Sequence, residues 1–198
     1  MIGYSYVITR DYGFAPNPFG QYCTLATCKP VIRRCAKLGD IILGISQKCH
    51  GNNLIYAMMV EEKLTFNQYW NDPRFDYKKP VMNGSIVQMM GDNIYCFDVK
   101  NNRWRQLDSH HSLPGGKIND ANVENDTQSN AVLISSKFYY FGKTPIILPE
   151  SLKAITIVRR SHHCIDSQNA EDIWRFLGQN YAIGLHNEPS LFRKFIKT

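Results

Sequence analysis

The stretch from Thr9 to Ser46 brings reactive, polar and cationic side chains together between two apolar segments. It is too polar, and too rich in glycine and proline, to be part of a hydrophobic core. A small domain rarely keeps a connection of roughly twenty such residues unless they bind or react with something. The side chains in this stretch that can do so are Asp11, Asn17, Cys23, Thr24, Cys28, Lys29, Arg33 and Arg34.

Cys23 and Cys28 are candidate nucleophiles within this stretch. Neighbouring basic residues can lower the pKa of a thiol and so increase its reactive thiolate fraction. A histidine can serve as the base for such a nucleophile, and His111 (or His110 beside it), in a distant loop, is the candidate here. A chain with 6 cysteines and 6 histidines also offers such pairs by chance. Catalysis by a Cys/His pair is therefore a hypothesis that competes with simple binding.

Neither a metal site nor a cofactor site is predicted. Structural zinc sites typically use close ligand pairs such as CxxC, and the sequence contains no CxxC or HxxxH pair. It also lacks a GxxxxGK(S/T) phosphate loop, a dinucleotide-binding glycine fingerprint and a GxSxG nucleophile turn. A paired-carboxylate mechanism is the weaker alternative, because the acidic residues of the 108–130 loop are expected to be solvated; they are Asp108, Asp120, Glu124 and Asp126.

The same stretch carries what a nucleotide-binding pocket needs. Such a pocket combines aromatic faces for stacking, polar groups for base edges and cations for phosphate. A short helix that begins near Pro30 would add its N-terminus to the phosphate site. The candidates for stacking are Tyr12, Phe14, Phe19, Tyr22, Trp70 and Trp104. Those for the base edge are Asp11, Asn17 and Thr24, and those for phosphate are Lys29, Arg33 and Arg34.

Composition and charge restrict the class of protein. A chain of 198 residues with 43% hydrophobic residues is long enough for one domain with a real core. The net charge of +6 and the pI of about 9.0 permit attraction to nucleic acid. No run approaches the roughly eighteen apolar residues of a transmembrane helix, and the N-terminal MIGYSYVIT lacks the charged region of a signal peptide. We therefore expect a cytoplasmic protein that does not bind membranes and keeps its cysteines as free thiols.

Short strands and a few short helices are expected to position these residues. Strands are predicted at 2–9, 41–46, 54–64, 86–90, 93–99, 103–107, 131–142 and 155–160, with 41–46 and 54–64 paired antiparallel. Helices are predicted within 28–38, 65–75, 171–180 and 188–198. Pro30 suits the first position of the first of these helices, and Thr65 can cap the second. The segment 108–130 is expected to be loop.

This succession predicts an α+β fold, namely a small mixed, mainly antiparallel β-barrel with short peripheral helices. We expect a single domain over residues 1–198, with a core at about 1–145 and a C-terminal helical extension at about 150–198.

The segment GFAPNPFGQYCTLATCKPVIRR, together with LTFNQYWNDPRF and VLISSKFYYFG, resembles the nucleotide modification-associated domain type 2 family. The order of elements, with KLGD after the basic helix and DP in NDPRF, also resembles the EVE branch of the PUA-like superfamily. The resemblance covers most of residues 2–142 and implies a compact β-barrel that holds a flipped, often modified base under the first loop. By analogy the pocket would use Asp11, Asn17, Cys23, Thr24, Lys29 and Arg33, with Ser46 at the end of the following strand.

Three hypotheses on function follow. In the first, the protein is a nucleic-acid or nucleotide binding module that recognises a modified base in a pocket formed by the 10–35 loop. In the second, it is an enzyme that acts on a nucleotide or nucleic-acid base through a Cys/His pair, as part of a base-modification or phage defence system. In the third, it binds a protein partner in a multi-component system, using Trp174 and the C-terminal helices as a docking face.

Overall fold

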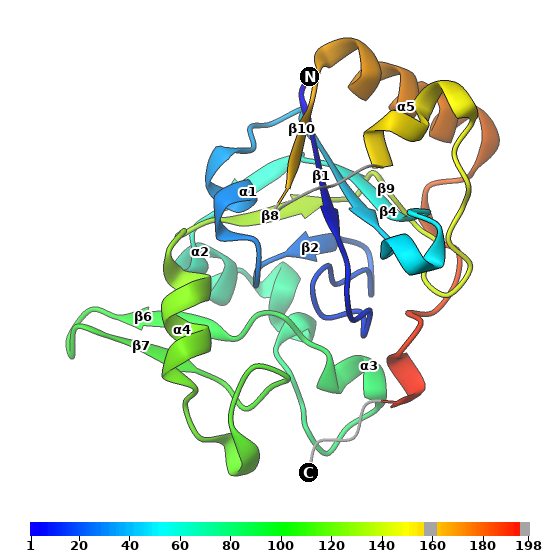
Figure 1. Cartoon of the computed structure of the whole chain (residues 1–198). Helices are drawn as coiled ribbons and strands as arrows, with labels where there is room; N and C mark the ends of the chain where they lie inside the picture. Colours follow the sequence, from blue (N-terminus) through cyan, green and yellow to red (C-terminus); the bar gives the residue numbers. More distant parts are fainter. Residues whose placement is uncertain (157–161, 195–198) are drawn as a thin grey trace.

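The computed structural model of the chain describes residues 1–156 and 162–194 (Figure 1). Its largest element is a six-stranded mixed sheet with the strand order β10-β1-β3-β4-β9-β11. β1 pairs with β3 in parallel, and β11 pairs with β9 in parallel, whereas the other neighbours are antiparallel. The strands are β1 (Gly3–Val7), β3 (Ile41–Ile45), β4 (Leu54–Met59), β9 (Phe138–Tyr140), β10 (His163–Ile165) and β11 (Gly184–Leu185).

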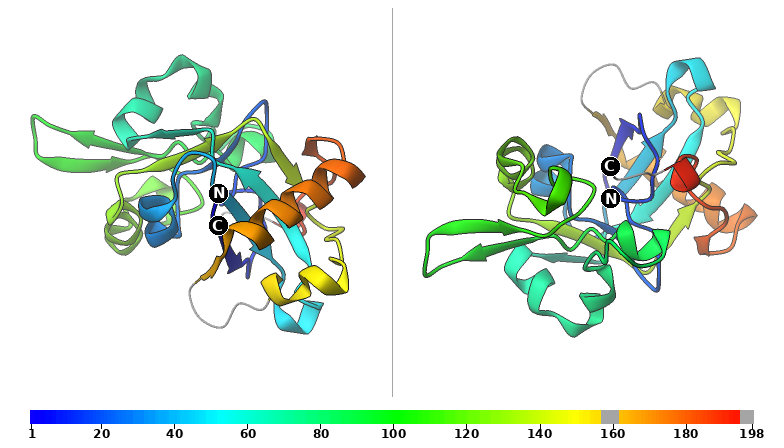
Figure 2. Two further views of the ribbon diagram at one scale, coloured as in Figure 1. Left: turned by 90° about the horizontal axis from the view of Figure 1, so that it is seen from above. Right: turned by 90° about the horizontal axis from the view of Figure 1, so that it is seen from below.

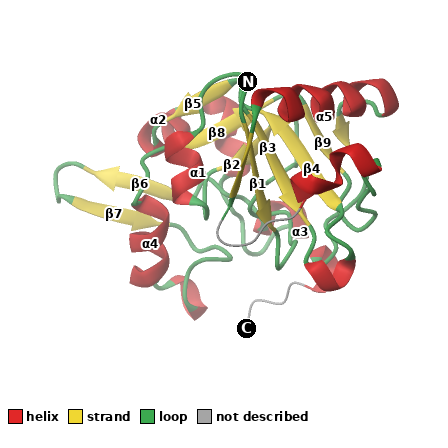
Figure 3. Cartoon of the chain, turned by 45° about the horizontal axis from the view of Figure 1, so that its top comes forward, coloured by secondary structure: helices red, strands yellow, loops and turns green. Residues whose placement is uncertain are grey.

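Two smaller sheets lie beside the large one. A three-stranded sheet has the order β2-β8-β5, and β6 and β7 form a two-stranded hairpin that projects from the body of the molecule (Figures 1 and 3). Their strands are β2 (Cys23–Leu25), β5 (Glu62–Leu64), β6 (Tyr95–Asp98), β7 (Arg103–Gln106) and β8 (Val132–Ser135).

The expected β-barrel is wrong, because none of these sheets closes on itself. The outer strands of the large sheet, β10 and β11, each pair on one side only. A parallel pair needs a crossover connection of a dozen or more residues, and the segment between β1 and β3 supplies it for this sheet. The long stretch that begins at Thr9 is thus the crossover between two parallel strands, and it carries β2 and α1 (Pro30–Cys35).

Both faces of the large sheet are covered. On one face, side chains such as Tyr6 and Ile42 pack against β2, α1 and β8. On the other face, Ile41 and Leu43 belong to the same hydrophobic cluster as Ile173 and Leu177 of α5 (Ser167–Asn180). This helix lies across the sheet (Figure 2). A strand that is buried on both faces has an almost continuous apolar sequence, which accounts for the run IILGI of β3.

Local sequence signals located three of the helices correctly. α1 has Pro30 in its first turn, and α5 falls where the predicted helix 171–180 lies. α2 (Phe66–Asn71) begins at Thr65, whose side chain accepts from the backbone N–H of Gln68 in a capping box. The antiparallel pairing predicted for 41–46 with 54–64 is confirmed for β3 and β4, whereas the end of the predicted strand is the separate strand β5, which pairs with β8.

Two helices arise where none was expected. The predicted strand 86–90 is instead α3 (Ile86–Met89), which a capping box between Ser85 and Gln88 begins. The predicted loop 108–130 contains α4 (Asp120–Thr127), whose Asn119 caps its first turn. Short 3₁₀ helices complete the described elements, at Lys48–His50, Pro73–Lys78, Pro114–Gly116, Glu150–Thr156 and Phe192–Lys194.

The segment after residue 150 adds α5 and both outer strands of the large sheet, β10 and β11. Trp174 of α5 lies partly buried against Tyr139, with ring centroids 5.3 Å apart. Residues 157–160 of the predicted strand 155–160 and residues 195–198 of the predicted last helix lie outside the described residues. None of the helices in the described ranges combines the length and the apolar character that crossing a membrane requires.

Candidate active site

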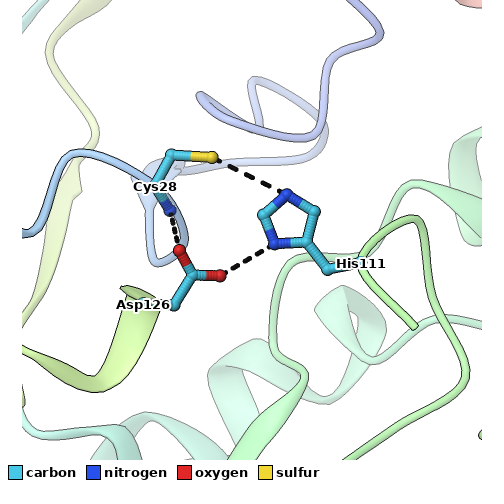
Figure 4. Close-up of side chains that lie close together, drawn as sticks. All are labelled: Cys28, His111 and Asp126. Atoms are coloured by element: carbon cyan, nitrogen blue, oxygen red, sulfur yellow. Dashed lines mark hydrogen bonds and ion pairs between the residues drawn. The ribbon is translucent and has the colours of Figure 1, made fainter. Parts of the chain in front are cut away.

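Three side chains from distant parts of the chain form a connected row (Figure 4). The Cys28 sulfur lies 3.7 Å from Nε2 of His111. Nδ1 of the same ring lies 2.8 Å from Oδ2 of Asp126. The imidazole therefore stands between a thiol and a carboxylate, which is the arrangement that activates a cysteine nucleophile through an oriented histidine.

The backbone turn at Cys28 directs this side chain. Cys28 and Lys29 adopt consecutive left-handed conformations, with φ angles of 58° and 42°. Left-handed backbone is uncommon for residues other than glycine and is found more often at functional sites. The N–H of Cys28 donates to Oδ1 of Asp126 at 2.7 Å, so the turn is tied to the carboxylate that orients the histidine.

His111 lies in the loop that follows β7, and three neighbours fix it. Its backbone carbonyl accepts from the amide of Asn122 at 2.8 Å and from the amide of Gln106 at 3.2 Å. Its ring packs on Phe14, with centroids 4.7 Å apart. β7 and α4 thus fix the backbone of His111, and the crossover from β1 contacts its ring.

Asp126 lies on α4 and is fully buried. Besides the bonds to Cys28 and His111, it accepts from the hydroxyl of Tyr95 at 3.0 Å. Burial by itself would raise the pKa of Asp126, but the hydrogen bond and charge of His111 outweigh it and lower the pKa. Burial by itself would lower the pKa of His111, but its bonds to Asp126 and Cys28 raise that pKa to about 9. At neutral pH the pair is therefore a carboxylate and an imidazolium.

A cavity of about 580 Å³ opens beside the row, and Cys28 and His111 line it. Tyr12 and Lys29, two of the residues expected to bind a nucleotide, line the same cavity. The volume falls within the range of about 300 to 1,000 Å³ that is usual for small-molecule sites. A ligand in this cavity would have direct access to the sulfur.

Comparison with known proteins assigns the chain to a family. A family model described as nucleotide modification associated domain 2 matches residues 1–195. The chain belongs to this family. No curated protein and no solved structure matches the chain, so the resemblance to EVE domains finds no support. Membership of this family indicates a role in systems that modify nucleotides or nucleic acids. The family description does not say whether the domain binds a nucleotide or catalyses a reaction on it.

Arg33, which we expected to bind phosphate, is fully buried in this nucleotide modification associated domain. Its guanidinium donates to the backbone carbonyls of Cys28 at 2.7 Å, Ser129 at 3.0 Å, Ala131 at 2.5 Å and also Asp126. Burial lowers the pKa of Arg33 to about 10, so the group is still charged at neutral pH. Arg33 joins the turn of Cys28 to the end of α4 and has no access to a ligand.

Asn17 and Thr24, expected at a base edge, are buried in a polar network away from the cavity. Asn17 accepts from Nζ of the buried Lys78 at 2.7 Å and donates to the carbonyl of Met90 at 2.8 Å. Thr24 donates to Asp92 at 2.6 Å. These bonds hold the crossover against the segment that precedes β6.

Asp11 and Ser46 also serve the fold in this structure. Asp11 is buried, accepts from the hydroxyl of Tyr140 and accepts from the N–H of Ser190 at 3.1 Å, which ties the C-terminal segment to the crossover. Ser46 accepts from the N–H of Asn53 at 2.8 Å within the connection between β3 and β4. Neither residue lines the cavity.

The remaining candidates lie on other parts of the molecule. The ring of Tyr22 packs on that of Phe75, with centroids 5.4 Å apart. The centroid of the Trp70 ring lies 5.1 Å from Nζ of Lys79. Cys23 is fully buried, and burial raises the pKa of its thiol to about 12. Of the two candidate nucleophiles, only Cys28 therefore combines access to the cavity with a neighbouring histidine.

Sequence reasoning missed Asp126 as a partner of His111. The residue was expected in a solvated acidic loop, yet its side chain is buried between Cys28, Tyr95 and His111. α4 lacks the apolar stripe that normally indicates which face of a helix is buried. No local spacing links a histidine in one loop to an aspartate on the next helix, so only the tertiary structure reveals this pair.

The sulfur, imidazole and carboxylate also form the group of potential metal ligands found among the described residues. Cys28 faces Nε2, however, while Asp126 bonds Nδ1 on the other side of the ring. The three ligand atoms lie within 4.8 Å of one another, but an ion at one imidazole nitrogen would replace the contact that this nitrogen makes with Cys28 or with Asp126. Proton transfer along the row requires no such replacement.

The raised pKa of His111 predicts a stability that depends on pH. The ordinary pKa of a histidine is 6.5, and that of His111 in the folded protein is about 9. Between these two pH values the folded state therefore binds one proton more than the unfolded state. This stabilisation is complete below the lower value and is lost as the pH rises through the upper one. Urea unfolding should show the advantage of the wild type over His111→Gln shrinking by about 3 kcal/mol between about pH 6 and pH 10. An advantage that stays constant over this range would contradict the ion pair.

Proposed function

We propose that this protein is a cysteine-dependent enzyme that acts on a carbonyl carbon, such as that of an amide or ester group, carried by a nucleotide or nucleic-acid base. The observation that carries the proposal is the imidazole of His111, bonded to Asp126 at one nitrogen and facing the Cys28 sulfur at the other. Membership of the nucleotide modification associated domain 2 family supports the choice of substrate.

The chemistry follows from the protonation of the row. An imidazolium beside a sulfur favours the thiolate, which is the form that attacks electrophiles. The thiolate of Cys28 forms a C–S bond to the carbonyl carbon, and the leaving amine or alcohol takes the proton from Nε2 of His111. Water then gives a proton to Nε2 and its hydroxide to the carbon, which restores the thiolate and releases a carboxylic acid that loses its proton to the solvent. Asp126 keeps the imidazole oriented and stabilises its charge throughout.

Recognition of a modified base is part of the same proposal. Residues from both ends of the 10–35 stretch line the cavity, among them Tyr12 and Lys29. A pure reader of a modified base would need stacking and hydrogen bonds but no thiol paired with an oriented histidine. The triad-like row therefore favours a reacting site over a site that only binds.

The first test compares the reactivity of the cysteines. At pH 7, iodoacetamide labelling followed by peptide mass spectrometry should modify Cys28 at least about tenfold faster than the exposed Cys49 and Cys164, because only Cys28 faces an imidazolium. Cys28→Ser should lose this fast phase and leave the other rates unchanged. If Cys28 reacts no faster than Cys49, the enzymatic proposal fails and binding alone remains.

A further inference from the structure

The charge of the cavity wall is one-sided. Among the described residues that line it there are two permanent cations, Arg10 and Lys29, and three histidines. None of these lining residues is an aspartate or a glutamate. Such a wall raises the local concentration of anions and disfavours cationic ligands.

Lys29 is the most informative of these cations. It follows the proposed nucleophile directly, and its Nζ lies 4.7 Å from the centroid of the Tyr6 ring. No carboxylate within the described ranges forms an ion pair with it. Burial lowers the pKa of Lys29, with the neighbouring Cys28 acting in the opposite direction. A partly buried ammonium is usually paired with an anion, so a ligand is the natural source of the missing charge.

An aromatic surface lies in the same cavity. The rings of Tyr12 and His110 are 4.9 Å apart, and Phe14 lies 5.3 Å from His110 and 4.7 Å from His111. All four rings line the cavity. Aromatic faces of this kind support the stacking of any base, because every base presents a π face.

We propose that the cavity binds a phosphate-bearing nucleotide, with the phosphate at Lys29 and Arg10 and the base against Tyr12 and His110, within reach of Cys28. This inference rests on the proposed function and names its substrate class. The shared chemistry is a base with an adjacent phosphate, which either a free nucleotide or a nucleotide unit within a polynucleotide can supply.

Calorimetric titration of Cys28→Ser, which cannot turn a substrate over, tests the inference without requiring catalysis. The probes are the common nucleoside monophosphates in ribo and deoxy form, the matching nucleosides, and a short single-stranded oligonucleotide. The monophosphates should bind about tenfold tighter than the nucleosides, as a charge-assisted contact to phosphate predicts. A preference for the oligonucleotide over the monophosphates would assign the site to nucleic acid, and the reverse would assign it to free nucleotides.

Lys29→Gln in the same background removes the charge and keeps the length of the side chain. It should reduce the preference for monophosphates, with Arg10 as the remaining cation, and leave the affinity for nucleosides unchanged. Lys48→Gln is the matched control, because Lys48 is exposed and does not line the cavity. Equal affinity for nucleosides and monophosphates, no effect of Lys29→Gln, or no binding of any probe would each overturn the inference. Labelling of Cys28 by a neutral reagent needs no nucleotide, so these outcomes are distinguishable from failure of the enzymatic proposal.

Discussion

Replacing His111 by glutamine is expected to slow the alkylation of Cys28 at pH 7 by at least about tenfold. The thiolate is the form of a cysteine that is alkylated, and a neighbouring imidazolium favours that form. Glutamine keeps the size and polarity of the side chain but carries no charge, so this electrostatic assistance is lost. The measurement is the rate of iodoacetamide incorporation at Cys28 by peptide mass spectrometry.

Asp126→Asn should produce a loss of the same order by a different route. The carboxylate accepts from Nδ1 of His111 and supports the charge of the ring. An amide can instead donate to Nδ1, which places the remaining proton on Nε2 and leaves a neutral ring that cannot act as a base toward Cys28. The two variants together test whether the charge on the imidazole, and not its presence alone, activates the sulfur.

His50→Gln is the control for these variants, because His50 is exposed and does not line the cavity. It should leave the labelling of Cys28 unchanged. If His111→Gln reduces the labelling of Cys28 by less than about twofold while the protein stays folded, then the sulfur is not activated by this ring and the catalytic role of the row is refuted.

Local chemistry was enough to predict several elements of the fold, but not how the strands are connected. Pro30 and the Thr65 capping box each act within a single turn of helix, so the sequence nearby contains all the necessary information. The parallel pairing of β1 with β3 depends on contacts across the whole crossover. Alternating apolar residues do not reveal the direction of a neighbouring strand, and this is why the short strands suggested a closed, mainly antiparallel barrel.

The candidate site divides in the same way. Residue type alone drew attention to Cys28 and His111, because thiols and imidazoles are rare and reactive. The same reasoning did not foresee the burial of Arg33, since a cation at the start of a helix looks the same in the sequence whether it faces phosphate or backbone carbonyls. Burial decides between these roles, and burial of a charged side chain is a property of the tertiary structure that composition does not reveal.

Arg33→Met is expected to lower the free energy of unfolding by about 3 to 5 kcal/mol. Methionine fills part of the volume but leaves the carbonyls of Cys28, Ser129 and Ala131 without their buried donor. A buried acceptor that loses its partner retains the full cost of its desolvation, and the large value reflects several such groups around one side chain. Urea unfolding monitored by circular dichroism measures the loss.

Arg34→Met provides a matched control on the same helix, because Arg34 is exposed and its replacement should change the stability by no more than about 0.5 kcal/mol. The Arg33 variant should also slow the alkylation of Cys28 under conditions in which it remains folded, since the guanidinium joins the carbonyl of Cys28 to that of Asp126. Equal stability of the two variants would show that Arg33 is not the buried connection between the cysteine turn and α4. The guanidinium of Arg33 would then lie at the surface, where it could contact phosphate as the sequence suggests.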